Sequence, residues 1–164
     1  MTFYYTGVGA RMAPVSILLI MTGIATKLAT IDHVLRSGGA FGSDRAFEYG
    51  AGTFKHIFYA KHATKESMDI AAYFHPAWER CDDYAKRLHG RNSFQVLGPN
   101  LNDPSKFLIC WTPDGCISHL TRSQATGGTG TAISIAEYYK VPIYNLSIPE
   151  HLSVWEKWFR KGGS

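Results

Sequence analysis

The amino-acid sequence predicts an α/β fold, with a doubly wound, mostly parallel sheet of about five strands and helices on both of its faces. Short apolar segments occur in turn with helical stretches along the chain, which is typical of parallel strands joined by right-handed crossovers. These segments lack a clean alternation of apolar and polar residues, as expected for strands that are buried on both faces. The 164 residues suffice for one domain, 1–164, with one core.

The first half of the chain contains the signals that open such a sheet. Pro14 suits the first turn of a helix, and Ser43 suits a helix N-cap. Glycines follow the first two strands and predict tight loops there. The expected elements are a strand at Thr2–Thr6, a helix from Pro14 to about Thr30, a strand at Ile31–Arg36, a helix at Asp44–Gly50 and a strand at Lys55–Ala60.

The second half begins with a long polar-rich stretch, Thr64–Pro104, which is expected to be a helical insertion within the single domain. Gly90 is interpreted as a helix stop within it. Helices are expected at Lys65–Phe74 and Ala77–His89, followed by an extended loop over Arg91–Pro104. The remaining expected elements are a strand at Lys106–Trp111, a helix at Thr131–Lys140, a strand at Val141–Leu146 and an amphipathic helix at Glu150–Arg160.

Composition and charge exclude several classes of protein. With 45% hydrophobic and 18% charged residues, the chain is not disordered, collagen-like or a coiled coil. Its net charge of +4 comes from lysines and arginines scattered in ones and twos, so a nucleic-acid partner is disfavoured. The apolar run Val15–Ala25 is too short to span a bilayer, so no membrane partner is expected. Three cysteines without C-x-x-C spacing predict reduced thiols and a cytoplasmic protein.

Three glycine-containing loops lie where ligands bind in an open parallel sheet, outside the carboxyl ends of the strands. The loops are Thr6–Arg11, Arg36–Asp44 and Thr126–Thr131. Glycine lets the backbone approach an anion closely, and a following helix N-terminus offers unpaired amides. Three such loops at one edge therefore predict a site for phosphate and ribose. Its predicted residues are Gly7, Gly9, Arg11, Ser37, Gly38, Gly39, Gly42, Asp44, Arg91, Asn92, Trp111, Gly127, Gly128, Thr129, Gly130 and Thr131.

Neither the dinucleotide-binding pattern G-x-G-x-x-G nor the P-loop pattern is present, which disfavours an NAD dehydrogenase or an NTPase. No cofactor is predicted. The run S-G-G-A-F-G-S-D at 37–44, with Ala46, Glu48 and Gly50-Ala51 after it, resembles the signature of the DNA-processing protein A family. That family belongs to the SLOG superfamily, so the resemblance implies a Rossmann-like, nucleotide-binding domain.

Two further loops are similar to motifs of the same superfamily. Thr6–Arg11 resembles its first-strand loop, and Thr126–Thr131 is similar to the P-G-G-x-G-T loop of the Lonely Guy phosphoribohydrolases. The run W-T-P-D-G at 111–115 resembles small single-domain members from phage genomes. The chain departs from the Lonely Guy pattern where that family has a catalytic glutamate, because Ala132 and Ile133 stand there. Against the DNA-processing protein A family, this single domain is expected to lack the flanking domains.

Asp44 and Glu48 are the candidate catalytic residues. They are four residues apart on one predicted helix, so both carboxylates are expected on one face. Asp44 would accept a hydrogen bond from a ribose hydroxyl, and Glu48 would act as nucleophile or general base at an anomeric carbon. The alternative is structural: Asp44 as a favourable acid at a helix N-terminus and Glu48 as a solvated side chain.

Four other side chains have both a functional and a structural interpretation. Arg11 is expected to clamp a phosphate, or else to be a surface arginine. Arg91 and Asn92 would form a lid for phosphate and base, or else follow a helix end. Trp111 would stack on a base, or else belong to the core. The histidines have no metal-ligand spacing and lie on different predicted elements, so no metal site is expected.

The predicted function is binding of a nucleotide or nucleotide-derived ligand at the carboxyl edge of the sheet, with hydrolysis or transfer at its N-glycosidic bond as the enzymatic version. Two alternatives stay open. One is a non-enzymatic sensor or sequestering protein for a nucleotide signal. The other, implied by the resemblance, is a single-stranded DNA-binding recombination mediator. The aromatic stripe Trp155–Phe159 is either a packing face or a surface for the homo-oligomer that the family resemblance implies.

Overall fold

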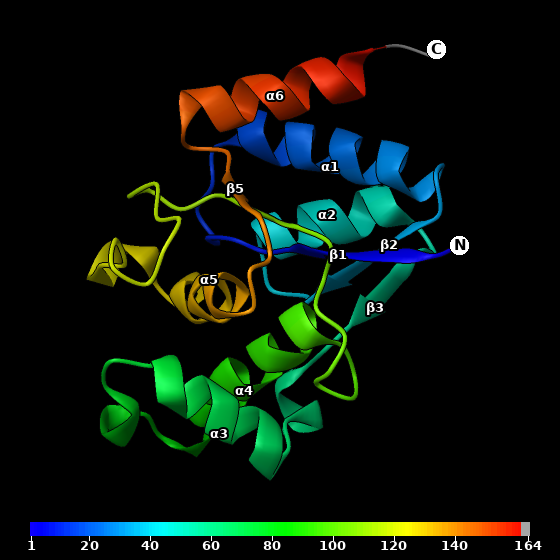
Figure 1. The fold of residues 1–164 in the computed structure, drawn as a ribbon. Coiled ribbons are helices and arrows are strands. Elements are labelled where there is room, and N and C mark those ends of the chain that lie inside the picture. The colour runs from blue at the N-terminus through cyan, green and yellow to red at the C-terminus, as the bar shows by residue number, and fades with distance from the viewer. Residues whose placement is uncertain (162–164) are drawn as a thin grey trace.

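The computed structural model describes residues 1–161 and confirms the α/β, Rossmann-like fold. Its centre is a five-stranded sheet in the order β3-β2-β1-β4-β5, in which all neighbouring strands are parallel (Figure 1). The strands are β1 (Phe3–Gly7), β2 (His33–Ser37), β3 (Lys55–Ile57), β4 (Leu108–Cys110) and β5 (Ile143–Asn145).

The strand order reverses at β1, and this reversal positions the candidate site. The chain adds β2 and β3 on one side of β1 and then returns to add β4 and β5 on the other side. Thr6 pairs with Arg36 of β2 and with Leu108 of β4, so β1 lies between the two halves of the sheet. Connections leave the carboxyl ends of β1 and β4 in opposite directions, which opens a crevice there.

One face of the sheet is covered by α1 (Val15–Ala29), α2 (Ser43–Ala51) and α6 (Pro149–Arg160), which lie together in Figure 1. Tyr5, Leu35 and Ile109 of the sheet pack against this layer and are fully buried. Trp155 of α6 is 9% exposed and packs into the same core, while Phe159 approaches Gly23 of α1. The aromatic stripe of the last helix is therefore a packing face.

The opposite face is covered by α4 (Asp83–Leu97) and α5 (Thr129–Tyr138), with α3 (Lys65–Phe74) packed outside α4. The extended loop predicted for Arg91–Pro104 is wrong over Arg91–Leu97, because α4 continues through Gly90 to Leu97, and a loop follows only from Gly98 to Pro104. Val96 and Leu97 are fully buried against β4 and α5. The apolar end of the polar-rich stretch thus forms part of the core, and α4 is a structural layer of the sheet.

Gly90 lies inside α4 because α3 passes very close to it. A Cβ atom at this position would lie 2.6 Å from Cγ of Met68 and 3.3 Å from Cβ of Ala63. The missing side chain is what lets the two helices approach. Gly90 therefore permits a close helix contact and does not produce the helix end that had been expected.

The Gly90→Ala variant is expected to lose about 1–3 kcal/mol of unfolding free energy, the usual cost of overpacking a filled core. Alanine has the higher helix propensity, so a helix that ended here, or that packed loosely, would gain stability. Urea unfolding monitored by circular dichroism separates the two signs. Arg87→Ala at an exposed site of the same helix is the matched control, with a change expected within about 0.5 kcal/mol.

Several predicted boundaries shift for local reasons. The helix expected from Ala77 starts only at Asp83, where Oδ1 of Asp82 accepts a 2.8 Å hydrogen bond from the Ala85 amide. The hydroxyl of Ser43 does not cap α2, because it donates to the Ala10 carbonyl at 2.8 Å. Within residues 1–161, no helix has both the length and the apolar character needed to cross a bilayer.

Candidate functional site

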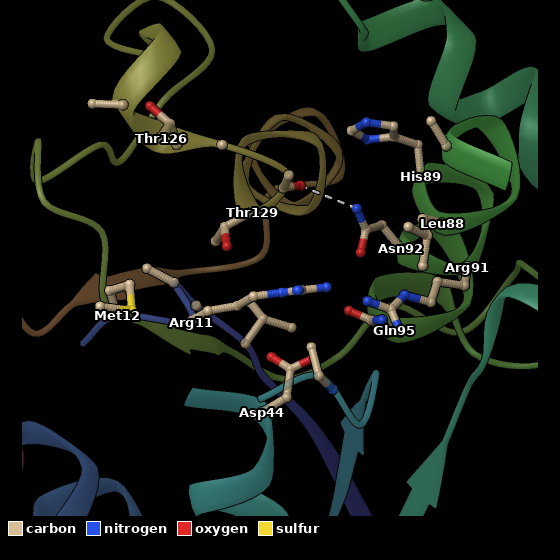
Figure 2. A pocket seen from close by; sticks show the side chains of 18 of the residues that line it. Arg11, Met12, Asp44, Leu88, His89, Arg91, Asn92, Gln95, Thr126 and Thr129 are labelled. Atoms are coloured by element: carbon tan, nitrogen blue, oxygen red, sulfur yellow. Dashed lines mark hydrogen bonds between the residues drawn. The ribbon is translucent and has the colours of Figure 1, made fainter. Parts of the chain in front are cut away.

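A pocket with a volume of about 390 Å³ opens at the strand-order reversal, outside the carboxyl ends of β1 and β4. Its size falls within the range of about 300–1,000 Å³ that is usual for small-molecule sites. The β1 loop, the start of α2, one face of α4 and the start of α5 surround it (Figure 2). Of the predicted ligand residues, it brings together Gly9, Arg11, Asp44, Arg91, Asn92, Gly127, Gly128 and Thr129.

One wall of the pocket is the N-terminus of α5. The helix begins at Thr129 after Gly128 and has no side-chain N-cap. The amides of Gly130 and Thr131 donate to the carbonyls of Gly127 and Gly128 at 3.1 and 3.2 Å, so the amides of Gly128 and Thr129 are the ones left for a ligand. Asp114 fixes the preceding loop: its carboxylate accepts hydrogen bonds from Ser123, at 2.7 Å, and from Thr126. Burial raises the pKa of Asp114, but these hydroxyl donors outweigh it, so the pKa is lowered overall. The loop is thereby held without a ligand.

The three threonine hydroxyls of this loop differ in role. Thr126 is 2% exposed and bonded to Asp114, while Thr131 is fully buried and accepts a 2.9 Å hydrogen bond from Arg122. Thr129 is the remaining threonine of the loop, and its side chain lies at the pocket in Figure 2. Gly130 serves packing, since a Cβ there would lie 2.4 Å from Nε of Arg122. Gly130 and Thr131 therefore support the site from below.

Two arginines face each other across the pocket. Figure 2 shows the Arg11 side chain extending from the β1 loop toward α4, where Arg91 and Asn92 lie. No ion pair to Arg11 is found among residues 1–161. Arg91 donates one hydrogen bond to the Gly38 carbonyl, and its Nε has no partner. Asn92 donates to the Gly128 carbonyl at 3.1 Å, which ties α4 to the α5 loop.

Gln95 and Asp44 form the floor between the arginines. The Gln95 side chain is 1% exposed, yet neither its Oε1 nor its Nε2 has a hydrogen-bond partner. Burial raises the pKa of Asp44 to about 6, although Arg91 and the amides of Ala40, Gly38 and Gly9 lower it in part. Both groups carry a desolvation cost that a bound polar ligand would relieve.

Close backbone packing holds the β1 loop in place. Gly42 has φ = 80°, and a Cβ there would lie 2.2 Å from the Arg11 carbonyl oxygen. Ser43 bonds the neighbouring Ala10 carbonyl. Gly42 therefore positions Arg11 without lining the pocket. Gly7 and Ser37 lie deeper, with the Ser37 hydroxyl donating to the Gly7 carbonyl at 2.5 Å.

The side chains of Glu48 and Trp111 also lie away from the pocket. The Glu48 carboxylate pairs with Lys55 Nζ at 2.8 Å and lines a separate groove beside β3, although Asp44 on the same helix faces the pocket. Trp111 packs against the core under α1, so its structural interpretation holds. What Trp111 contributes to the site is its carbonyl, which accepts a 3.0 Å hydrogen bond from the Ala10 amide.

A second, more open groove adjoins the pocket across Arg11 and Arg91, and we call it the Tyr59 groove. Gly38 and Gly39 of the second glycine loop lie here, outside the pocket. Its side chains combine cations with aromatic rings. They are Arg11, Arg45, Arg91, Lys61, Phe41, Tyr59 and Tyr84.

The fold thus gathers cations that are scattered along the sequence. Of the Tyr59 groove side chains, Arg11 and Arg91 belong to the predicted site, whereas Arg45, Lys61, Phe41, Tyr59 and Tyr84 were absent from it, as were Asp114 and Arg122. Their individual residue types are unremarkable, and only the strand order brings them together.

No family model and no curated protein sequence matches the chain. Among solved structures, the fold is similar to that of DNA processing protein A from Helicobacter pylori, with a TM-score of 0.58 and 16% sequence identity. The match covers 88% of this chain and 65% of that chain, and that structure is described for its single-stranded DNA binding mode. The chain therefore has the Rossmann-type fold of DNA processing protein A and spans about two thirds of that protein's length.

Proposed function

We propose that this protein binds a nucleotide, with its phosphate at the N-terminus of α5 and its ribose and base over Asp44 and Gln95. The observation that carries the proposal is the buried Gln95 carboxamide, which has a free donor and a free acceptor between two arginines. A base edge offers the complementary donor and acceptor. The amides of Gly128 and Thr129 would bind the phosphate, and Arg11, whose side chain extends into the pocket, would bind it in a bidentate way.

Gln95→Leu is expected to change stability and binding in opposite directions. Leucine removes an unpaired buried amide, so the free protein should gain up to about 1–3 kcal/mol of unfolding free energy. The same change should weaken nucleotide binding by about tenfold, the equivalent of one net hydrogen bond. Thermal shift with a panel of nucleoside monophosphates, and with the matching nucleosides, measures both effects.

The exposed Gln124→Leu is the control, and neither quantity should change in it. Nucleosides should bind more weakly than their monophosphates, because they lack the phosphate. Equal affinity of wild type and Gln95→Leu for every nucleotide would refute the assignment of Gln95.

Cleavage of the N-glycosidic bond is the enzymatic version of this proposal. Asp44 is the acidic residue that lines the pocket, and a pKa of about 6 suits a general acid or base near neutral pH. Glu48 is paired with Lys55 in another groove. Release of free base from a nucleoside monophosphate should therefore stop in Asp44→Asn and continue in Glu48→Gln. If no base is released while binding persists, the protein is a nucleotide sensor or sequestering protein.

The Tyr59 groove favours a second candidate function, single-stranded DNA binding. Tyr84 is 65% exposed and Tyr59 44% exposed, and both lie among the cations Arg45 and Lys61. Aromatic rings for base stacking beside cations for phosphates are what single-strand sites use. DNA processing protein A from Helicobacter pylori, whose fold is similar, binds single-stranded DNA.

Oligothymidylate binding measured at several salt concentrations tests this second candidate. Contacts to several phosphates predict an affinity that falls steeply and log-linearly with salt. If the protein binds a mononucleotide but has no affinity for the oligonucleotide at low salt, single-stranded DNA binding is excluded and the nucleotide proposal stands.

A further inference from the structure

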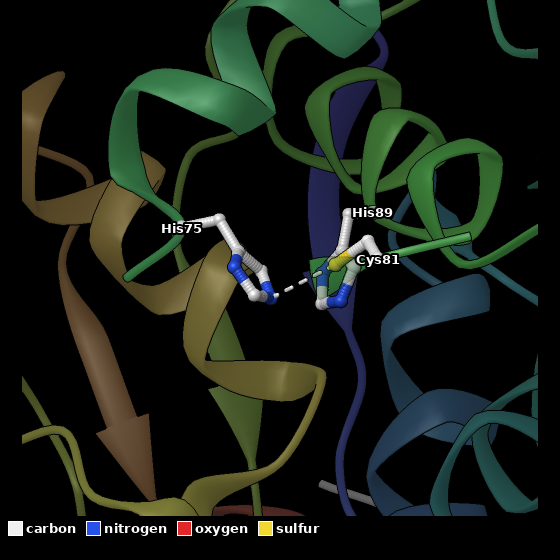
Figure 3. A group of neighbouring side chains, drawn as sticks. All are labelled: His75, Cys81 and His89. Carbon is white, nitrogen blue, oxygen red and sulfur yellow. Dashed lines mark hydrogen bonds between the residues drawn. The ribbon is translucent and has the colours of Figure 1, made fainter. Parts of the chain in front are cut away.

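Three side chains that the sequence places on separate elements meet beside the pocket. His75 follows the end of α3, Cys81 follows the short helical turn Trp78–Arg80, and His89 lies within α4. One ligand atom from each lies within 4.8 Å of the others. Figure 3 shows the three side chains gathered at one place. No metal site was expected because the histidines are far apart along the sequence. The short helical turn between α3 and α4 reverses the chain and brings these three side chains together.

We propose that His75, Cys81 and His89 form a binding site for a transition-metal dication of borderline softness, of which Zn²⁺ is the chemical type. Imidazole nitrogen with thiolate sulfur is the donor set that such ions prefer. His75 Nε2 and Cys81 Sγ are 3.7 Å apart. Two such ligands on one tetrahedral zinc ion would be about 3.6 Å apart, given Zn–N near 2.0–2.1 Å and Zn–S near 2.3 Å. The fourth position is left for water or another small ligand.

His89 has the outer hydrogen-bond partner that a metal-bound histidine usually has. Its Nδ1 lies 3.0 Å from the Thr131 hydroxyl oxygen, which also accepts a hydrogen bond from Arg122 at 2.9 Å. An Nδ1 proton directed at that oxygen leaves Nε2 with the free lone pair. Such an outer partner on the second ring nitrogen is the usual support of a metal-bound histidine.

His75 must change one hydrogen bond to take part. In the metal-free protein its Nδ1 accepts a 2.9 Å bond from the Ala77 amide, so the ring proton is on Nε2 and faces Cys81. Binding through Nε2 moves that proton to Nδ1 and releases the Ala77 amide. Ala77 is only half-buried, so water can replace the lost acceptor. The amide therefore reports on metal binding directly.

Titration of the metal-free full chain with Zn²⁺ or Co²⁺ alone tests the site. One equivalent should bind, and Co²⁺ should give a thiolate-to-metal charge-transfer band. Cys81→Ser should abolish that band, although the buried Cys110 and Cys116 remain. His75→Ala should weaken binding by more than the roughly 10–100-fold that an outer-shell partner is worth. His56→Ala, at an exposed histidine on β3, is the control and should bind as wild type does.

The amide NMR signal of Ala77 provides a second readout, because it should move on metal binding in wild type and stay in place in Cys81→Ser. Retention of the charge-transfer band in Cys81→Ser, or an unmoved Ala77 signal at saturation, would overturn the site. Cys81 and His75 do not line the nucleotide pocket, so nucleotide binding without metal should survive in both variants. Failure of the metal site and failure of the proposed function are thus separate results.

Discussion

The Asp44→Asn variant is expected to be more stable than wild type at pH 8 by up to about 3 kcal/mol. Asp44 is 4% exposed and its pKa is about 6, against about 3.9 for an unfolded aspartate. Above pH 6 Asp44 is therefore ionised in the folded protein, and the buried charge destabilises the fold relative to a neutral side chain. Each pKa unit is worth about 1.4 kcal/mol, which gives the stated limit.

The sign of the pH dependence follows from the same shift. Between about pH 4 and 6 the folded protein binds a proton at Asp44 that the unfolded chain has lost, so Asp44 contributes stability as the pH falls. His89 acts in the opposite direction, because burial and the nearby His75, Arg122 and Arg91 lower its pKa to about 4. Only the difference between wild type and Asp44→Asn isolates the contribution of Asp44.

Urea unfolding of both proteins from pH 5 to pH 8 measures this difference. The advantage of Asp44→Asn should begin to shrink as the pH falls through 6 and should be about half as large at pH 5 as at pH 8. Asp32→Asn, at an exposed aspartate whose positive φ asparagine tolerates, is the matched control. A constant difference for Asp44→Asn across the range would contradict the raised pKa.

The Arg91→Met variant is expected to lose both stability and binding. Arg91 is the cation that lowers the pKa of Asp44, so its loss leaves a buried carboxylate without a counter-charge. The cost at pH 8 should be about 2–4 kcal/mol, toward the lower end of what breaking a buried charge pair costs. Nucleotide affinity should fall by about 10–100-fold, the equivalent of one charge-assisted hydrogen bond to phosphate.

A double variant separates these two effects. With Asp44→Asn in the background, Arg91→Met should cost much less stability, because no carboxylate is left unpaired. The loss of nucleotide affinity should remain, since it comes from the ligand's own charge. Arg87→Met, at an exposed arginine one turn earlier in α4, should change neither quantity. Equal stability losses in both backgrounds would show that Arg91 acts by packing alone.

The fold could be predicted from sequence because its signals are local. Glycine loops after apolar strands, and helices between them, specify a parallel sheet whatever the distant partners are. Gly90 shows where this reasoning fails, since a helix-breaking residue was needed for a tertiary contact with Met68. The continuation of α4 to Leu97 is likewise stabilised by burial, which outweighs the weak local signal.

The site could be predicted only in part. Glycine loops carry a local signal, so Gly9, Arg11 and Gly128 were predicted at the sheet edge where the pocket lies. Helix spacing predicted that Asp44 and Glu48 act together. In the structure Asp44 lines the pocket, whereas Glu48 lies outside it and pairs with Lys55. Arg45 and Lys61 of the Tyr59 groove, and the three side chains of the proposed metal site, are brought together only by tertiary contacts. A sequence pattern carries no record of such contacts.

The most direct test of the nucleotide site is an amide NMR titration of the labelled protein with nucleoside monophosphates. If the account is right, the largest shifts are at Gly127–Thr129 and Gly9–Arg11, and Arg11→Ala removes them without changing the rest of the spectrum. Saturating nucleotide that leaves these amides in place, or that moves signals only in α6 and β5, would contradict a phosphate at the start of α5.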